Sequence, residues 1–597
     1  MAASAVLVWW GLRLSFLAGC IAIVLTRLVH QIPLSLEQSG STTTQQSFCY
    51  QGVRTDTTAS DQNVNCFTVS DGRFTRVFSS PVETETNDEG EEEVEVQSGY
   101  VLPGLWDGHG HLLQYGEFLH SVDLFGSQSV EEILSRLRAY VDSHPGAGSK
   151  DEWVRGIGWD QMALGGMPTA DMLESDPRLK GLYMMLDRVD VHCTWVSQPV
   201  LSLFAPGDIP DEVPGGEIIR DPGMGVFCDN AMDLIMPLWP RPDRTKKGVF
   251  LRSAMKELHK AGLVGMHDAG VFPHDINLYR TLSEENPEEW TLRVYAMLEC
   301  KERNTFCPED AVRYSSDFLS VRSVKLFADG ALGSWGSAMI DPYSDRPDTS
   351  GSLLVNSSTL TALTQQWSDV GFQVNIHAIG DLANRYAIDA FESALQKICP
   401  GGLADCEKRD TRFRIEHAQI IHPDDQTRMF KLGVIPSIQP THATSDMAYA
   451  EKRLGPERTS TEAYRMKSLL KLTPVLGSDF PVEPPNPFEG VYAAVTRKNP
   501  HTGQGPKGWE GGWHTEQALS LEEALDGFTK GAAYGAFMEG KAGVIKEGAF
   551  ADWVVLDKPL ESLSVEELRK VKVRETWVGG RRVYAREDED GEEVKDL

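Results

Sequence analysis

Residues of the types that bind metals stand at the carboxyl ends of apolar runs in this chain. His109 and His111 are separated by one residue and follow the run 101–108. Other apolar runs end in the remaining candidates, which are Lys325, His377, His417 and Asp479. In an extended strand, residues two apart point the same way, so His109 and His111 can hold one ion together. Imidazole and carboxylate groups suit divalent metals such as zinc, so the set predicts a metal site.

Each of these residues also has a purely structural explanation when it is taken alone. A histidine after a strand is most often a hydrogen-bonded core residue, and an aspartate after Gly477-Ser478 is usually a turn or a helix cap. The ordered set of His-x-His, Lys, His, His and Asp, with each member closing an apolar run, is much harder to obtain by chance. We therefore interpret the set as one site.

The elements that must position this set are strands and helices in alternation. Apolar β-type runs alternate with helical stretches over most of the 597 residues, which predicts a parallel sheet with crossover helices. In a (β/α)8 barrel the carboxyl ends of the strands meet at one mouth, so residues far apart in sequence would come together there. We predict an α/β fold with a metal-dependent (β/α)8 TIM barrel over 103–540.

Smaller parts are predicted around this barrel. Short β-type runs near both chain ends predict a small β-sandwich domain built from 49–102 and 541–586. The span between His111 and Lys325 is too long for two simple βα units, so we expect an inserted subdomain within 112–320 that covers the mouth. Residues 587–597 form an acidic tail.

The N-terminal hydrophobic segment bears on localisation. Ala5 to Thr26 is largely apolar, with Arg13 as its only charge, and a helix of that length spans about 30 Å of hydrocarbon. We interpret 1–30 as an uncleaved signal anchor, with a cleaved signal peptide and a buried helix as alternatives. The polar segment 31–48 is interpreted as a linker. The predicted localisation is the secretory pathway, as a single-pass membrane protein with a lumenal or extracellular catalytic domain, or as a secreted protein.

The cysteines and the charge refine this prediction. The close pairs Cys300/Cys307 and Cys399/Cys406 predict disulfides in an oxidising lumen, with scattered thiols in a reducing compartment as the alternative. Asn356 begins a single glycosylation sequon, which predicts a glycoprotein. The net charge of −30 argues against binding to nucleic acid. The expected partners are a small-molecule substrate and, through the N-terminal segment, a membrane, while a homodimer stays open.

Several motifs carry a family resemblance. PGLWDGHGH (103–111) resembles the opening motif of the amidohydrolase superfamily. Four more are similar to its family 3, which includes N-substituted formamide deformylases: VKLFADGALGSWGSA (324–338), HAIGDLANRYAID (377–389), RIEHAQII (414–421) and GSDFPVEPPNP (477–487). The resemblance extends over most of the chain and leaves out the N-terminal segment and the linker.

The resemblance implies a site with two divalent metal ions, zinc in the first place and manganese or iron as alternatives. His109 and His111 would hold the first ion, and His377 and His417 the second. Lys325 would bridge both ions as an N-carboxylated lysine; a salt-bridged barrel lysine is the alternative for this residue.

The implied reaction is hydrolysis of a non-peptide carbon–nitrogen bond in an amide, formamide or cyclic amide of a small molecule. Asp479 would bind on the metal side, act as the general base and then pass its proton to the leaving nitrogen. A deaminase of the same superfamily is an alternative, but such sites carry a glutamate where this chain has Gly380. A non-catalytic barrel scaffold is the other alternative.

Substrate contacts are predicted less directly, from polar and aromatic residues near other strand ends. The candidates are Trp159, Arg188, Asp190, His192 and His442. His267 and Asp268 close another strand and could orient ligands. By strand alternation, Glu416 should point away from His417.

Overall fold

The computed structural model describes residues 45–56, 64–79, 95–399 and 410–587. From Gln46 onward the chain forms one compact unit. The signal anchor or signal peptide (1–30), most of the linker (31–48) and nearly all of the acidic tail (587–597) lie outside the described residues.

Eight parallel strands among the described residues form the barrel. Neighbours in the sheet follow one another along the chain: β5 (Leu105–Gly110), β12 (Leu263–Val271), β13 (Arg293–Leu298), β15 (Leu319–Phe327), β16 (Gln373–Ala378), β17 (Arg414–His417), β18 (Ile435–Ile438) and β19 (Val475–Leu476). A parallel bridge between Gly110 and Phe480 joins the last strand to the first. The barrel is all-parallel and nearly closed, which confirms the predicted (β/α)8 architecture.

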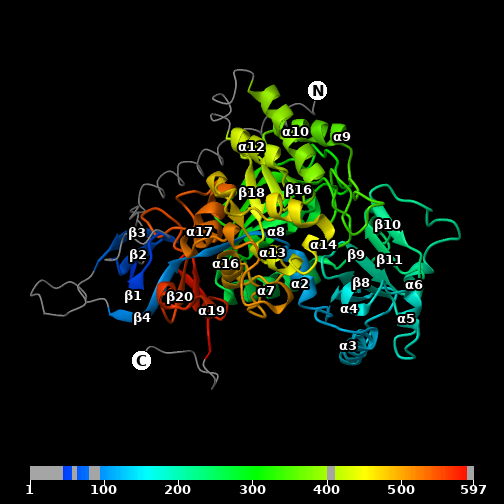
Figure 1. The fold of residues 1–597 in the computed structure, drawn as a ribbon. Coiled ribbons are helices and arrows are strands. Elements are labelled where there is room, and N and C mark those ends of the chain that lie inside the picture. The colour runs from blue at the N-terminus through cyan, green and yellow to red at the C-terminus, as the bar shows by residue number, and fades with distance from the viewer. Residues whose placement is uncertain (1–44, 57–63, 80–94, 400–409, 588–597) are drawn as a thin grey trace, which may run out of the picture. The chain divides into compact units, whose positions relative to one another are not determined.

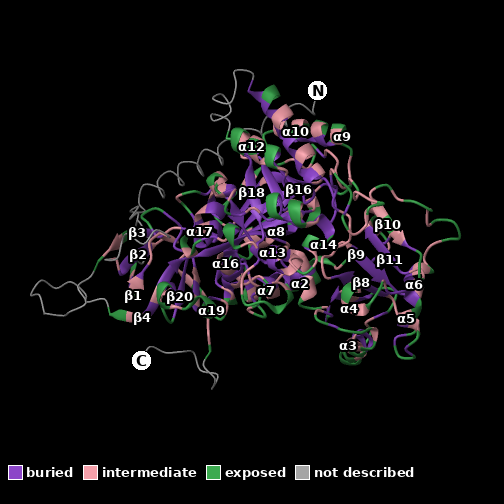
Figure 2. Cartoon of the chain, in the orientation of Figure 1, coloured by how far each residue is buried: buried purple, intermediate pink, exposed green. Residues whose placement is uncertain are grey.

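Burial on both faces explains why the sequences of these strands are continuous apolar runs. Every residue of β13 and β16 is buried, because side chains fill the barrel interior on one face and helices cover the other. The helices α9 (Ser357–Asp369), α10 (Asp381–Ile398) and α12 (Pro423–Leu432) lie outside the strands (Figure 1). Figure 2 shows buried strands and exposed outer helix faces. On α10, Ala387, Phe391 and Leu395 are buried at four-residue spacing.

A separate six-stranded sheet is inserted between β5 and β12. Its order is β10 (Gly216–Ile219), β11 (Val226–Asp229), β9 (Cys193–Val196), β8 (Met184–Arg188), β7 (Val154–Trp159) and β6 (Val122–Asp123). Its own core includes Leu137, Trp159, Leu186 and Trp195. The sheet falls within the range 112–320 for which the sequence predicts an inserted subdomain.

Strands from the two chain ends pair in one seven-stranded sheet. Its order is β22 (Arg581–Ala585), β21 (Val573–Val578), β20 (Trp553–Leu556), β4 (Val96–Pro103), β1 (Gln46–Val53), β2 (Cys66–Ser70) and β3 (Arg73–Phe78). A bridge between Arg73 and Phe550 brings the β3 edge back toward the segment before β20. The strands expected to form a sandwich therefore belong to one continuous sheet.

Disulfides join Cys300 to Cys307, as predicted, and also Cys49 to Cys66 and Cys193 to Cys228. Cys399 is disulfide-bonded, and its predicted partner Cys406 lies outside the described residues. Glycosylation of Asn356 and a homodimer stay predictions.

The prediction of a single-pass membrane protein needs correction. None of the helices in the described ranges is long and apolar enough to cross a bilayer. The apolar segment 5–26, on which that prediction depended, is not among the described residues.

Candidate metal centre and active site

The first part of the site lies where β5, β15 and the segment after β19 meet. One carboxylate oxygen of Asp479, Oδ1, lies 3.2 Å from His111 Nε2 and 3.4 Å from His109 Nε2. Lys325 Nζ is 3.5 Å from His109 Nε2. Residues that are hundreds of positions apart in sequence thus meet at the carboxyl ends of their strands.

The second part of the site lies at the ends of β16, β17 and β18. The rings of His377 and His417 have centroids 4.5 Å apart. The other oxygen of Asp479, Oδ2, is 3.9 Å from His417 Nδ1 and 3.7 Å from His442 Nε2. The structure therefore brings all six predicted ligands together and adds His442, which the sequence suggested only as a substrate contact.

Backbone conformation turns two of these side chains into the site. His417 and Asp479 adopt φ values of 74° and 63°, in the left-handed region that residues other than glycine seldom occupy. The Asp479 amide donates a hydrogen bond to the His109 carbonyl, 2.7 Å away. Unfavourable backbone geometry of this kind concentrates at functional sites.

Glu416 belongs to the site although strand alternation suggested otherwise. Its Oε2 lies 2.5 Å from His109 Nδ1 and accepts a hydrogen bond from Arg414 Nη2 at 2.9 Å. Alternation fails because the left-handed conformation of His417 ends the regular strand, so both Glu416 and His417 face the interior. The sequence signal that could have identified Glu416 is its position: it is a charged residue within a run that the sequence predicts to be a barrel strand. The structure shows that every residue of this strand is buried.

Asp107 is a second residue whose role the sequence did not reveal. Its carboxylate accepts hydrogen bonds from the Ser478 hydroxyl at 2.6 Å and from the His109 amide at 3.0 Å. A Cβ at Gly477 would lie 2.5 Å from Asp107 Oδ1, so glycine is needed there. These contacts tie the first strand to the segment that carries Asp479.

The electrostatics of the site fit a metal. Burial lowers the pKa of His109 to about 4 and the pKa of His377 and His417 well below the usual histidine value, so these imidazoles are neutral and can ligate. Burial also lowers the pKa of Lys325, which favours the uncharged amine that carboxylation requires.

The buried donor atoms are also arranged for ligation. Within the described part of the chain, Nε2 of His377 and Nε2 of His442 are buried without a hydrogen-bond partner. Two groups have their ligand atoms within 4.8 Å of one another and share Asp479: His109, His111 and Asp479, and His417, His442 and Asp479. This set of nitrogen and oxygen donors fits divalent metal ions.

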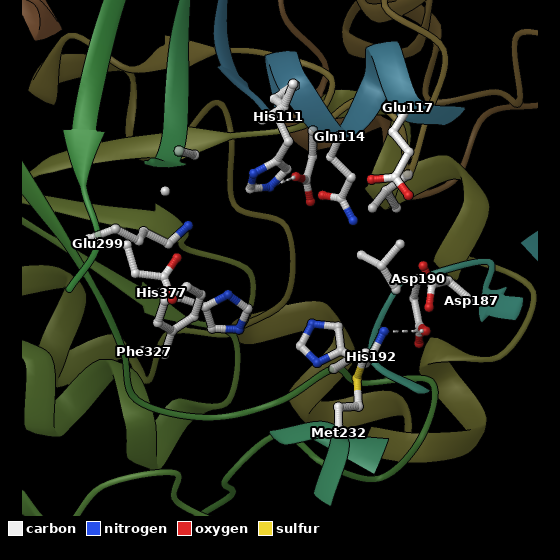
Figure 3. A pocket seen from close by; sticks show the side chains of 18 of the residues that line it. His111, Gln114, Glu117, Asp187, Asp190, His192, Met232, Glu299, Phe327 and His377 are labelled. Atoms are coloured by element: carbon white, nitrogen blue, oxygen red, sulfur yellow. Dashed lines mark hydrogen bonds and ion pairs between the residues drawn. The ribbon is translucent and has the colours of Figure 1, made fainter. Parts of the chain in front are cut away.

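A cavity of about 530 Å³ opens in front of these residues. Figure 3 shows His111, Glu299 and His377 on one side, facing Asp187, Asp190 and Met232 on the other. His111, Glu299 and His377 lie at the ends of barrel strands. Asp187, Asp190 and Met232 lie in the inserted sheet or in segments that follow its strands. A substrate would therefore lie between the barrel mouth and the inserted sheet.

Comparison with known proteins identifies the family. The model of the amidohydrolase family matches residues 92–584. The chain belongs to the amidohydrolase family. It is 30% identical to the protein LONG AFTER FAR-RED 3 of Arabidopsis thaliana (86% of this chain, 88% of that protein) and 27% identical to the putative amidohydrolase YtcJ of Bacillus subtilis (89% and 97%). It is also 25% identical to the N-substituted formamide deformylase of Arthrobacter pascens (83% and 90%).

Solved structures agree with this assignment. The fold is similar to that of an uncharacterized metal-dependent hydrolase from Pyrococcus horikoshii, with a TM-score of 0.68, 25% identity and coverage of 87% of this chain and 99% of that one. The corresponding protein from Pyrococcus furiosus has a TM-score of 0.65, at 24% identity and with coverage of 86% and 99%. The expectation of an enzyme is confirmed: the chain is a metal-dependent hydrolase of the amidohydrolase family.

The predicted substrate contacts of this amidohydrolase divide into two groups. Asp190, His192 and His442 line the cavity. Arg188 is buried and does not line it; its guanidinium holds Asp190 through two hydrogen bonds of 2.6 and 2.7 Å. Trp159 requires a correction, because it is fully buried in the core of the inserted sheet and donates its indole N–H to the Leu186 carbonyl.

His267 and Asp268, the proposed orienting pair, have different partners. His267 Nδ1 lies 2.6 Å from Arg414 Nη1, below the site. Asp268 lines the cavity and accepts a hydrogen bond from Tyr279 at 2.9 Å.

Gly380 marks the position where a deaminase of this superfamily would carry a glutamate. Its amide donates a hydrogen bond to Asp329 at 2.8 Å. A Cβ at this position would lie 2.0 Å from the Ala338 carbonyl oxygen, so the backbone leaves no room for any side chain. The local structure of this amidohydrolase therefore argues against the deaminase alternative.

Proposed function

We propose that this protein hydrolyses a carbon–nitrogen bond other than a peptide bond in a small molecule, such as an amide, a formamide or a cyclic amide. The position of Asp479 carries the proposal. One of its oxygens approaches His109 and His111, and the other approaches His417 and His442. A single carboxylate between two groups of candidate ligands suits both metal binding and proton transfer.

The metal-binding roles follow from the same geometry. His109 and His111 would hold one divalent ion, and His417 would hold the other together with His377 or His442. Lys325 would supply the bridge after carboxylation of its neutral amine. Neutral imidazoles combined with carboxylates favour zinc.

The chemistry requires one base at the metal side of the cavity. Bound divalent ions would lower the pKa of a water molecule and polarise a substrate carbonyl. Asp479 accepts the proton of the attacking water and returns it to the leaving nitrogen. Glu416 keeps the Nδ1 proton of His109 engaged, so that Nε2 is directed to the site. Asp190 and His192 contact the substrate from the cavity wall, and His442 does so if His377 is the ligand of the second ion.

The formamide deformylase of Arthrobacter pascens supports this choice of bond, because that relative is named for cleaving N-substituted formamides and this chain covers 90% of it. The backbone at Gly380 speaks against the alternative of deamination, since a glutamate cannot replace it without displacing the Ala338 carbonyl.

The test is a substrate panel on protein loaded with zinc, with manganese and iron as further arms. The panel contains N-substituted formamides, hydantoins, N-acyl amino acids and exocyclic amidines that a deaminase would use. We expect turnover of at least one amide class and none of the amidines. Ammonia release from amidines alone, or less than about 0.2 metal ions per chain after reconstitution, would contradict the proposal.

A further inference from the structure

Arg241 differs in its charge environment from the other basic residues that line the cavity. Arg155 pairs with Glu117 and Asp187, and Lys247 pairs with Asp275. Of the remaining two, Arg303 pairs with Asp233 and Glu299, and Lys325 lies among the candidate metal ligands. In the described ranges no carboxylate comes within ion-pair distance of Arg241.

The segment that carries Arg241 is stiff. The residue stands between Pro240 and Pro242, and both rings fix their own φ angle and restrict the residue before them. Its guanidinium carbon lies 4.8 Å from the ring centroid of Trp239, and that of Arg155 lies 4.6 Å from the same indole. The Arg241 side chain is therefore held by a cation–π contact and is accessible from the cavity.

Contacts along α2 (Leu112–Phe118) relate Arg241 to the metal side of the cavity. His111 caps this helix, and Glu117, six residues later, accepts a hydrogen bond from Arg155 at 2.9 Å. Six helical residues rise about 9 Å. Arg155 and Arg241 both contact Trp239, so a chain of contacts links Arg241 to Glu117, which lies at the end of α2 opposite His111.

The cavity wall also includes apolar side chains. Leu113, Met232, Met236 and Phe250 all line it. A volume of about 530 Å³ falls within the range of about 300–1,000 Å³ that is typical of sites for drug-sized ligands, and is far more than an amide group needs. The cavity therefore has room for a substrate that extends well beyond the bond that is cleaved.

We propose that the substrate carries a carboxylate or a similar anion, which binds Arg241 and is joined to the scissile bond by an apolar spacer. This inference rests on the proposed function and names the substrate class for the same site. A guanidinium can bind a carboxylate through two parallel hydrogen bonds.

The test compares ω-acylamino acids of several chain lengths, each with its own methyl ester, using an acyl group that the wild-type enzyme removes. We expect wild-type kcat/KM to favour the acid by about 10–100-fold, as for a hydrogen bond to a charged group. Arg241→Gln should remove this preference through KM while the ester is unaffected, and Arg241→Lys should keep part of it.

Arg252→Gln is the matched control, because Arg252 lies on α7 (Arg244–Lys260), pairs with Glu289 and does not line the cavity. It should leave both substrates unchanged. Equal wild-type activity on acid and ester, or equal losses for both in Arg241→Gln, would overturn the inference. Failure of the wild type to cleave any amide would instead refute the proposed function.

Discussion

Glu416 Oε2 lies 2.5 Å from His109 Nδ1, and both side chains are fully buried. The carboxylate accepts a hydrogen bond from the Nδ1–H group, so Nε2 carries the free lone pair of the neutral ring. That atom faces Lys325 and Asp479. Carboxylates behind metal-binding histidines orient the ring and raise its basicity in this way.

Replacing this carboxylate should weaken metal binding. Glu416→Gln keeps the shape but lets an amide N–H face His109, so the ring loses its fixed tautomer. We expect the affinity for the ion that His109 would hold to fall by about 10–100-fold. Competition with a chromophoric chelator measures this affinity without any substrate.

Asp425→Asn provides the control for Glu416→Gln. Asp425 is also buried and paired with arginine, through Arg385 and Arg428, but it lies on α12 away from the cavity. This variant should lose stability and keep its metal affinity. Equal affinities of Glu416→Gln and wild type would show that Glu416 has only a structural role.

The predicted ligands could be found from sequence because their signal is local. Each one lies at or within two residues of an apolar run, and strand ends converge in a parallel barrel. His109 and His111 also satisfy the two-residue period of a strand. The barrel could be predicted as well, because the alternation of strands and helices is visible along the chain without knowledge of which strands pair.

Other parts of the site depend on geometry that no local pattern encodes. Glu416 faces the site because the backbone at His417 is left-handed. Asp107 reaches the segment that carries Asp479 because Gly477 has no side chain to block it. Trp159 looked like a cavity residue but belongs to the core of a sheet whose pairing is non-local. Arg241 lies in a connecting segment outside the helices and strands, so no helical or strand periodicity in the sequence marks it.

His259 should make the folded state sensitive to acid. It is 2% exposed, and its nitrogens bond to the Leu263 carbonyl and the Thr291 hydroxyl. Burial lowers its pKa to about 4, below the usual 6.5, so between these values the folded chain binds fewer protons than the unfolded chain. Its stability contribution is complete above pH 6.5 and is lost as pH falls toward about 4.

Urea unfolding of wild type and His259→Gln at pH 7.5 and pH 4.5 measures how the contribution of His259 to stability changes with pH. The variant cannot take up that proton, so its stability deficit at pH 7.5 should shrink by about 2–3 kcal/mol at pH 4.5. A deficit that stays constant or grows between the two pH values would contradict the assignment.

Lys325→Ala should remove metal and activity together, because it deletes the proposed bridge. A short carboxylate such as acetate or propionate, added at high concentration, should restore part of both by occupying the vacated space. Lys247→Ala is the comparison, since Lys247 is a cavity lysine paired with Asp275 and no carboxylate should rescue it. Full metal occupancy in Lys325→Ala would exclude the bridging role.

Asp479→Asn separates proton transfer from metal binding. The amide preserves the shape and one weak oxygen ligand, while the other proposed ligands remain, so metal content and thermal stability should change little. Loss of a positioned acid and base costs about 10² to 10⁴ in rate, and we expect the upper part of that range because Asp479 serves both attack and departure. Glu483→Gln, at a cavity carboxylate bonded to Ser445, should lose far less. If Asp479→Asn with full metal occupancy kept more than about a tenth of wild-type kcat, the proton would have to travel through another group.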